Sequence, residues 1–449
     1  MTAAGFRERP EPREPSELGN LSDFHVPSDP HDPSDRRDQE VPMPAMTIPK
    51  VLADLDTDPA TGDAAARDVV AYYHQPDKNA LLREAILPLA ERCAAHGLAA
   101  QVERHWLHGP HLRVRIDGPP EQVAAAAEQG VLAVRGWLRS HPSQSDRSTA
   151  ELLAEAAAAG RAELIAPPYG PVVPDNTARI ESVDRSGLRA LLGPDGAALR
   201  DDLLRLGLPA LRAGADFLAA AGDTSAARVQ LLVGVLTAHA AAHPGALVGG
   251  HYSYVSHLED FLLHDDPDGR LRQSFERRWT DSRAAVTALV ERVAAGRLQP
   301  AEQPWAYWST SAWELTQRRL AAGADLAGRP AAYAERAAAT GDQAALHRWT
   351  PELRSRFSEF HRMMRRADPR GGMFADPEYL VYRTCTNGLY RLLAGCGVRP
   401  VERYLAAYLV VQAVPELTGH RWRERLAEAA SLAAASGPAA ASSQEKAAS

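Results

Sequence analysis

Residues 104–116 read RHWLHGPHLRVRI, which predicts two strands joined by a tight turn at 107–110. Glycine and proline supply the backbone angles that such turns need. In the second strand, at 111–116, polar and apolar side chains alternate, and successive side chains of a strand point to opposite faces. One face is therefore apolar, and the opposite face carries the polar side chains of His111, Arg113 and Arg115.

The residues around this hairpin predict a small unit of strands and helices. A β-branched and aromatic run at 68–74 indicates a strand, and 79–95 has the apolar spacing of an amphipathic helix. The first strand of the hairpin is expected at 99–106, and a second amphipathic helix at 121–140. The order strand, helix, strand, strand, helix is most of a ferredoxin-like unit.

The rest of the chain is predicted to be mainly helical. A further strand is expected at 249–255 (GGHYSYV), where aromatic and small residues alternate. The fold class is therefore α+β, with a small antiparallel ferredoxin-like unit followed by a large helical region. Helices are expected at about 147–160, 186–221, 223–243, 269–296, 310–322, 330–340 and 400–412.

Composition limits the domain organisation and the function. The 449 residues are 45% hydrophobic and 24% charged, and the net charge of −7 argues against a broad nucleic-acid-binding surface. Proline-rich residues 1–66 are predicted to be a disordered leader, 67–428 the folded domain and 429–449 a disordered tail. Because the sequence has neither a secretory signal nor an apolar run long enough to span a membrane, we expect a cytoplasmic protein.

The polar face of the hairpin is the first candidate site. Arg113 and Arg115 lie about 7 Å apart along the strand, and two guanidinium groups at that spacing can clamp a carboxylate or a phosphate. The alternative is an ordinary strand face with a cross-strand ion pair, for example to Glu103. In the preceding strand, His105 joins the two arginines if the register permits, whereas Arg104 shares the opposite face with Trp106.

The second candidate site is the cluster HYSYVSHLEDF at 251–261. Tyr254, Ser256 and His257 are usable proton donors and acceptors when a substrate lies within hydrogen-bond reach. The alternative for Ser256 is to cap a helix that begins after it, with Glu259 completing a capping box.

Other polar and aromatic residues carry weaker signals. His361 and Asn387 lie in partly apolar surroundings, and each is either a site residue or an ordinary surface or packing residue. The sequence has no phosphate-binding loop, no dinucleotide fingerprint and no zinc motif, so no cofactor and no metal is expected. Four aromatic residues are expected in the core: Trp305, Tyr307, Trp308 and Trp313.

Several of these stretches resemble the lantibiotic dehydratase C-terminal domain, which is also called the thiopeptide-type bacteriocin biosynthesis domain. The resemblance spans about 69–416. It is carried by Tyr72-Tyr73, Leu87-Pro88-Leu89, RHWLHGPHLRVRI, SYVSHLEDF at 253–261, Phe360-His361 and NGLYRLLAGCGVRPVERY at 387–404.

The resemblance implies a lyase-type enzyme that modifies a ribosomally made peptide during antibiotic biosynthesis. One role in the family is a formal [4+2] cycloaddition of two dehydroalanines with release of the leader peptide. Another is glutamate elimination from glutamylated Ser or Thr. A non-catalytic peptide-binding scaffold is the remaining alternative. The implied partners are the precursor peptide with its leader and other enzymes of the pathway, with neither nucleic acid nor membrane.

Two departures from the elimination members favour the cycloaddition. Those members carry Arg-Tyr-Gly-Gly where this chain has Pro168-Tyr169-Gly170-Pro171, and a histidine where this chain has Arg383, four residues before Asn387. The predicted catalytic residues are Tyr254, Ser256 and His257. The predicted substrate-binding residues are Arg104, His105, His111, Arg113, Arg115 and Asn387.

Overall fold

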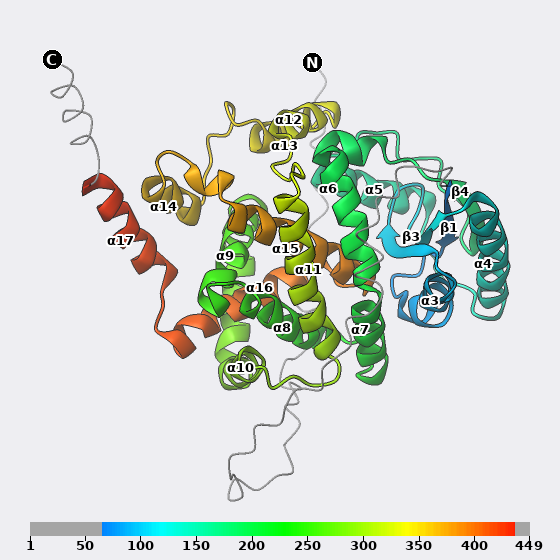
Figure 1. The fold of residues 1–449 in the computed structure, drawn as a ribbon, viewed down its shortest axis with the longest axis horizontal. Helices are drawn as coiled ribbons and strands as arrows, with labels where there is room; N and C mark the ends of the chain where they lie inside the picture. The colour runs from blue at the N-terminus through cyan, green and yellow to red at the C-terminus, as the bar shows by residue number, and fades with distance from the viewer. Residues whose placement is uncertain (1–64, 436–449) are drawn as a thin grey trace, which may run out of the picture.

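The computed structural model describes residues 65–435, and a four-stranded antiparallel sheet forms the N-terminal part of this range (Figure 1). The strand order is β2-β3-β1-β4. Of the predicted leader, only residues 65 and 66, which open the first strand, are described; the others lie outside the described residues. The strands are β1 (Ala65–Tyr72), β2 (Ala99–His105), β3 (His111–Gly118) and β4 (Thr177–Ser182).

The fourth strand completes the ferredoxin-like order, and the sequence pattern missed it. β4 pairs antiparallel with β1 at the edge of the sheet, opposite the predicted hairpin. Its sequence, TARIES, lacks the clear apolar alternation of a half-buried strand because only Ala178 is buried. An edge strand with one buried side chain leaves almost no periodic signal.

The two faces of the sheet are covered differently. Leu112, Val114 and Ile116 on β3 are fully buried on the apolar face. That face packs against α3 (Leu87–Ala95) and α4 (Pro120–Ser140). The polar face, with Arg113 and Arg115, packs instead against helices of the larger part of the chain. Short helical segments, α2 (Asn79–Leu81) and the π-helix η4 (Leu82–Ile86), lead into α3.

The larger part of the chain is helical, which confirms the α+β class (Figure 1). Of the four aromatic residues expected in the core, Trp305 and Trp308 are fully buried, whereas Tyr307 and Trp313 are only partly buried. None of the described helices is long and apolar enough to cross a membrane. The remaining elements are α5 (Thr149–Glu163), α6 (Ser186–Leu206), α7 (Leu208–Ala220), α8 (Ser225–Ala241), α9 (Ala246–Asp265), α10 (Arg270–Ala294), α11 (Gln303–Ala321), α12 (Pro330–Ala339), α13 (Gln343–Trp349), α14 (Glu359–Ala367), the 3₁₀ helix η5 (Gly372–Ala375), α15 (Pro377–Gly395), α16 (Pro400–Thr418) and α17 (Trp422–Ala435).

Several helix predictions differ from the structure at their ends: α11 begins at Gln303 rather than at 310, and α16 continues to Thr418 rather than ending at 412. The single helix expected at 186–221 is divided into α6 and α7 at Gly207, whose added Cβ would lie 2.4 Å from the Leu392 side chain. At the C-terminus, α17 continues to Ala435, so residues 429–435 of the predicted tail are helical. The rest of that tail lies outside the described residues.

The strand predicted at 249–255 was wrong, because these residues belong to α9. The small residues allow α9 to approach α8 closely: a Cβ on Gly250 would lie 2.4 Å from the backbone oxygen of Ala240. The alternation of aromatic and small residues therefore reflects helix packing rather than the two faces of a strand. For the same reason Ser256 lies inside α9 and does not cap its start.

Candidate functional site

Four polar residues of α9 share one face of the helix. Ser253, Ser256, His257 and Asp260 follow the spacing i, i+3, i+4 and i+7, which places side chains on one side of a helix. Leu258 and the other apolar residues of the same turns face the core. This polar face meets residues of α14 and α15, and it holds two of the three predicted catalytic residues.

A chain of two hydroxyls and one imidazole begins at this face. The Oγ of Ser256 lies 3.1 Å from Nε2 of His361, and Nδ1 of His361 lies 2.7 Å from the Oγ of Ser358. Ser358 also caps α14, since its Oγ accepts a hydrogen bond from the backbone N–H of His361. Burial lowers the pKa of His361, so the ring is neutral at pH 7 and can donate at one nitrogen and accept at the other.

The neighbouring histidine makes a second pair. Nδ1 of His257 lies 3.2 Å from the hydroxyl of Tyr390 on α15. Burial, followed by the nearby charge of Arg403, lowers the pKa of His257 to about 4, so this ring is neutral as well. The Arg403 guanidinium carbon lies 4.3 Å from the centre of the Tyr390 ring, which holds the phenol between a cation and an imidazole.

Tyr254, the third predicted catalytic residue, is turned away from this face. It is fully buried, and its hydroxyl donates to the backbone oxygen of Leu236 at 2.7 Å. Burial raises the pKa of Tyr254 well above its usual value. In this placement Tyr254 fixes α9 against α8 rather than presenting its hydroxyl to a substrate.

Two of the hollows among the described helices differ in chemistry. One, of about 150 Å³, lies between α9, α10 and α14. It is lined by Ser358, at the end of the hydroxyl–imidazole chain, with Glu259, Leu262, Leu263, Arg272, Glu359 and Arg362. The hydroxyl–imidazole chain therefore ends at a polar hollow rather than in the packed core.

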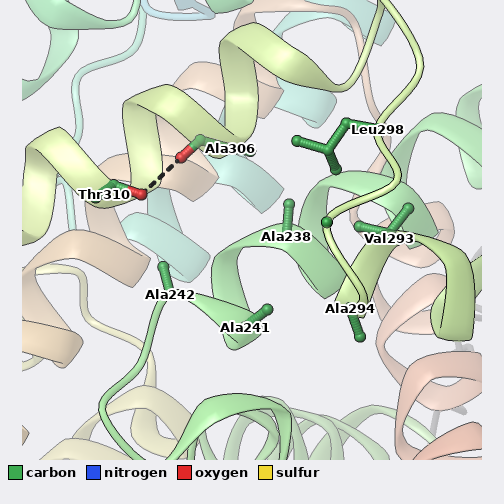
Figure 2. A pocket seen from close by; sticks show the side chains of 9 residues that line it. Ala238, Ala241, Ala242, Val293, Ala294, Leu298, Ala306 and Thr310 are labelled. Carbon is green, nitrogen blue, oxygen red and sulfur yellow. Dashed lines mark hydrogen bonds between the residues drawn. The ribbon is translucent and has the colours of Figure 1, made fainter. Parts of the chain in front are cut away.

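The second hollow offers no titratable group. Figure 2 shows this hollow, of about 180 Å³, with alanine and branched side chains around it. Thr310 donates its hydroxyl to the backbone oxygen of Ala306 at 3.2 Å, so its polar group is already satisfied. Its lining consists of Ala238, Ala241, Ala242, Val293, Ala294, Gly296, Leu298, Ala306 and Thr310.

Arg113 and Arg115 lie on one face of the sheet, but both guanidinium groups already form ion pairs with carboxylates of the protein. Arg113 Nη2 lies 2.9 Å from Glu103 Oε2 on the neighbouring strand, and Arg113 Nη1 lies 3.7 Å from Asp68 Oδ2. Arg115 contacts Asp117 at 2.8 Å and Asp201, on α6, at 2.7 Å. The cross-strand ion pair to Glu103, which was the alternative interpretation, is therefore what the structure contains.

Glu103 is the centre of this ionic cluster. Its carboxylate contacts Arg113, Arg200 and Arg185, and its side chain is 8% exposed. Burial opposes its ionisation, but the three guanidinium groups outweigh burial and hold the pKa of Glu103 well below its usual range. The polar face of the sheet is thus joined to α6 by buried charges.

For the carboxyl group of Asp68, burial outweighs the charges of the neighbouring arginines. Burial, only partly offset by Arg113, raises the pKa of Asp68 from its usual 3.8 to about 6. The folded protein therefore binds this proton more tightly than the unfolded chain, and the contribution of Asp68 to stability falls as the pH rises through 6. One oxygen of this carboxyl is buried without a hydrogen-bond partner.

We expect Asp68→Asn to remove this pH dependence. Between pH 5 and pH 7 the wild-type protein should lose about 1 kcal/mol of unfolding free energy relative to the variant, because Asp68 must ionise while buried. Urea unfolding of both proteins at the two pH values measures this difference. Parallel pH dependence of the two proteins would contradict the prediction.

The other predicted binding residues on the sheet are enclosed as well. His105 and His111 stack with their ring centres 5.6 Å apart, and burial lowers the pKa of each to about 3. Arg104 donates to the backbone oxygen of Pro76 at 3.3 Å. It also lies against Gly397, just after α15, where its charge suits the negative end of that helix.

Asn387 is exposed on α15, and this helix contacts both β2 and α9. Within the described part of the chain, no hydrogen bond or ion pair joins the sheet cluster around Arg113 to the α9 cluster around His257. The structure therefore forms two clusters from the predicted residues rather than one. No role was predicted for Ser358, Tyr390 or Arg403, and of these only Ser358, which caps an amphipathic helix, has a recognisable sequence signal.

Comparisons with known proteins agree with the predicted resemblance. Residues 68–180, from β1 into β4, match the model of a family described as lantibiotic biosynthesis dehydratase C-term. The chain is similar in structure to "Pyridine synthase, TbtD, from thiomuracin biosynthesis", with 19% identity, TM-score 0.57 and coverage of 79% of this chain and 99% of that chain. It is also similar to TsrL, with 18% identity, TM-score 0.53 and coverage of 84% and 99%. No curated protein matches this chain.

Proposed function

We propose that this protein matures a ribosomally made peptide by a formal [4+2] cycloaddition that joins two dehydroalanine residues and releases the leader peptide. The family match over 68–180 and the fold shared with the thiomuracin pyridine synthase support an enzyme of this class. The choice of this reaction rests on one observation, the ion pairs formed by the two arginines of the sheet. Arg113 and Arg115 are paired with carboxylates of the protein itself.

Glutamate elimination would need free cations for the carboxylates of the leaving glutamate. Such cations are not offered by the sheet face, because Glu103, Asp117 and Asp201 already neutralise its arginines. A substrate carboxylate would have to displace buried and well-compensated ion pairs. The cycloaddition makes no such demand, since its substrate atoms carry no net charge.

The first step of the cycloaddition is a change of tautomer. A proton moves from a backbone amide nitrogen to its carbonyl oxygen, which turns one dehydroalanine into a 2-azadiene. Two carbon–carbon bonds then form with the second dehydroalanine, and loss of water and of the leader peptide completes the aromatic ring. No net proton, electron or co-reactant is required.

Neutral groups that both donate and accept suit this proton movement. His361 lies between the hydroxyls of Ser256 and Ser358, so it can take up a proton at one nitrogen while it gives one up at the other. We assign to the hydroxyl of Tyr390, with His257 behind it, the donation of a hydrogen bond to the carbonyl oxygen of the reacting amide. Tyr254 holds α9 in place for both groups.

The test gives the purified protein two peptides in parallel. One carries glutamyl esters on serine. The other carries a leader peptide followed by two dehydroalanines, which are spaced so that they can form the ring. Mass spectrometry should show leader release and ring formation with the second peptide and no change in the first. Glutamate loss from the first peptide alone would overturn the proposal, and so would the absence of any mass change in both.

A further inference from the structure

A row of polar side chains on α15 runs beside the proposed site. Arg383, Asn387 and Arg391 are each four residues apart, a spacing that places them along one side of the helix. Asn387 is exposed and makes no hydrogen bond within the described residues. Tyr390, which contacts His257, lies in the same turn as Asn387 and Arg391. We call Arg383, Asn387 and Arg391 the α15 row.

Contacts at both ends hold the two arginines of the row in place. Arg383 donates to the backbone oxygens of Leu326 and Ala327 at 2.7 and 2.9 Å. Arg391 contacts Glu163, at the end of α5, at 3.3 Å and is half exposed. The side chain between them, Asn387, is the member of the row whose hydrogen-bonding groups are all available.

An exposed aromatic residue extends the row at its N-terminal end. The Arg383 guanidinium lies 5.8 Å from the ring centre of Tyr379, and Tyr379 packs edge-on against Phe374. Phe374 is 60% exposed, which is unusual for so large an apolar side chain. The surface therefore offers an apolar contact followed by hydrogen-bonding groups.

We propose that the α15 row binds the backbone of an extended segment of the precursor peptide next to the reacting residues. This proposal rests on the proposed function. A dehydroalanine has only a methylene group as its side chain, so its position must be fixed through the peptide backbone. The carboxamide of Asn387 carries both a donor and an acceptor, as a peptide group does, and can pair with both groups of one residue.

The dimensions fit a short segment. From Arg383 to Arg391 the helix rises about 12 Å, because each residue adds about 1.5 Å. An extended peptide covers that distance with about four residues at about 3.3 Å each. Guanidinium groups at the two ends would donate to peptide carbonyls, and Asn387 would bind in the middle. Such contacts select for an extended backbone rather than for particular side chains.

Binding of a peptide that cannot react separates this proposal from the proposed function. The probe is the fluorescently labelled precursor peptide, leader included, with alanine in place of both dehydroalanines. Fluorescence anisotropy should give a Kd about tenfold higher for Asn387→Ala and for Arg391→Ala than for the wild type, since each loses hydrogen bonds to the peptide. No cyclisation is needed for this result.

Matched controls come from an exposed surface elsewhere. Gln273→Ala and Arg277→Ala remove the same kinds of group from α10 and should leave Kd unchanged. An unchanged Kd for both α15 variants, or no binding by the wild type, would overturn the proposal whatever the peptide assay shows. Selective loss of binding in the α15 variants would uphold it even if the reaction proved to be different.

Discussion

Replacement of Glu103 by alanine should lower the free energy of unfolding by about 3–5 kcal/mol, which is the typical cost of breaking a buried ion pair. The variant would leave Arg113, Arg185 and Arg200 with one fewer carboxylate between the sheet and α6. Three like charges would then repel one another in a site from which water is largely excluded. We expect no other single change at the sheet face to destabilise the protein as strongly.

Urea unfolding followed by circular dichroism measures this loss. The control is Glu91→Ala, which removes an exposed carboxylate that also contacts an arginine, Arg212, at 2.8 Å. Because exposed ion pairs contribute little, the control should change the unfolding free energy by less than about 1 kcal/mol. Equal effects of the two substitutions would show that the buried cluster has no special role in stability.

Replacement of His361 by asparagine should reduce turnover of the dehydroalanine peptide by about 10²–10⁴-fold, the usual contribution of a proton-transferring side chain. Asparagine cannot accept and donate a proton in turn, so the connection between Ser256 and Ser358 would be broken. The cap of α14 would remain, because it uses the backbone N–H of residue 361. The fold should therefore persist while the reaction slows.

Single-turnover mass spectrometry gives the rate, and the thermal midpoint reports whether the fold is intact. His96→Asn is the control, since His96 is exposed after α3 and far along the chain from α9. Ser256→Ala should lose part of the rate at an unchanged thermal midpoint. Wild-type turnover in the His361 variant would remove this residue from the proposed mechanism.

Three of the four strands were predictable because their signals are local, whereas β4 was not. Alternating residues at 111–116 and the Gly109-Pro110 turn describe β3 and the hairpin without any knowledge of distant residues. α9 was not predictable in the same way. Its small and aromatic residues alternate over a few positions, whereas Ser253, Ser256, His257 and Asp260 have helical spacing over a longer range. The longer pattern gives the correct structure.

The site was predictable only in part, because its partners come from distant elements. Sequence spacing placed Ser256 and His257 together, but it did not place His361 against Ser256, 105 residues away. Likewise, Glu103 was a visible partner for Arg113, whereas Asp201 meets Arg115 across 86 residues. The substrate-binding role predicted for Arg113 implies that Arg113→Ala abolishes turnover without unfolding the protein. The buried contacts of Arg113 now lead us to expect a loss of stability in that variant.

The charged residues on the polar face of the sheet affect the tendency of the chain to aggregate during synthesis. All four strands and the helices on the apolar face lie within residues 65–182, so this unit can close before α6 leaves the ribosome. Until then its uncovered face displays arginines and carboxylates, which water solvates well, rather than an apolar patch. The unit can therefore persist until α6 is synthesised without exposing an apolar surface that would promote aggregation.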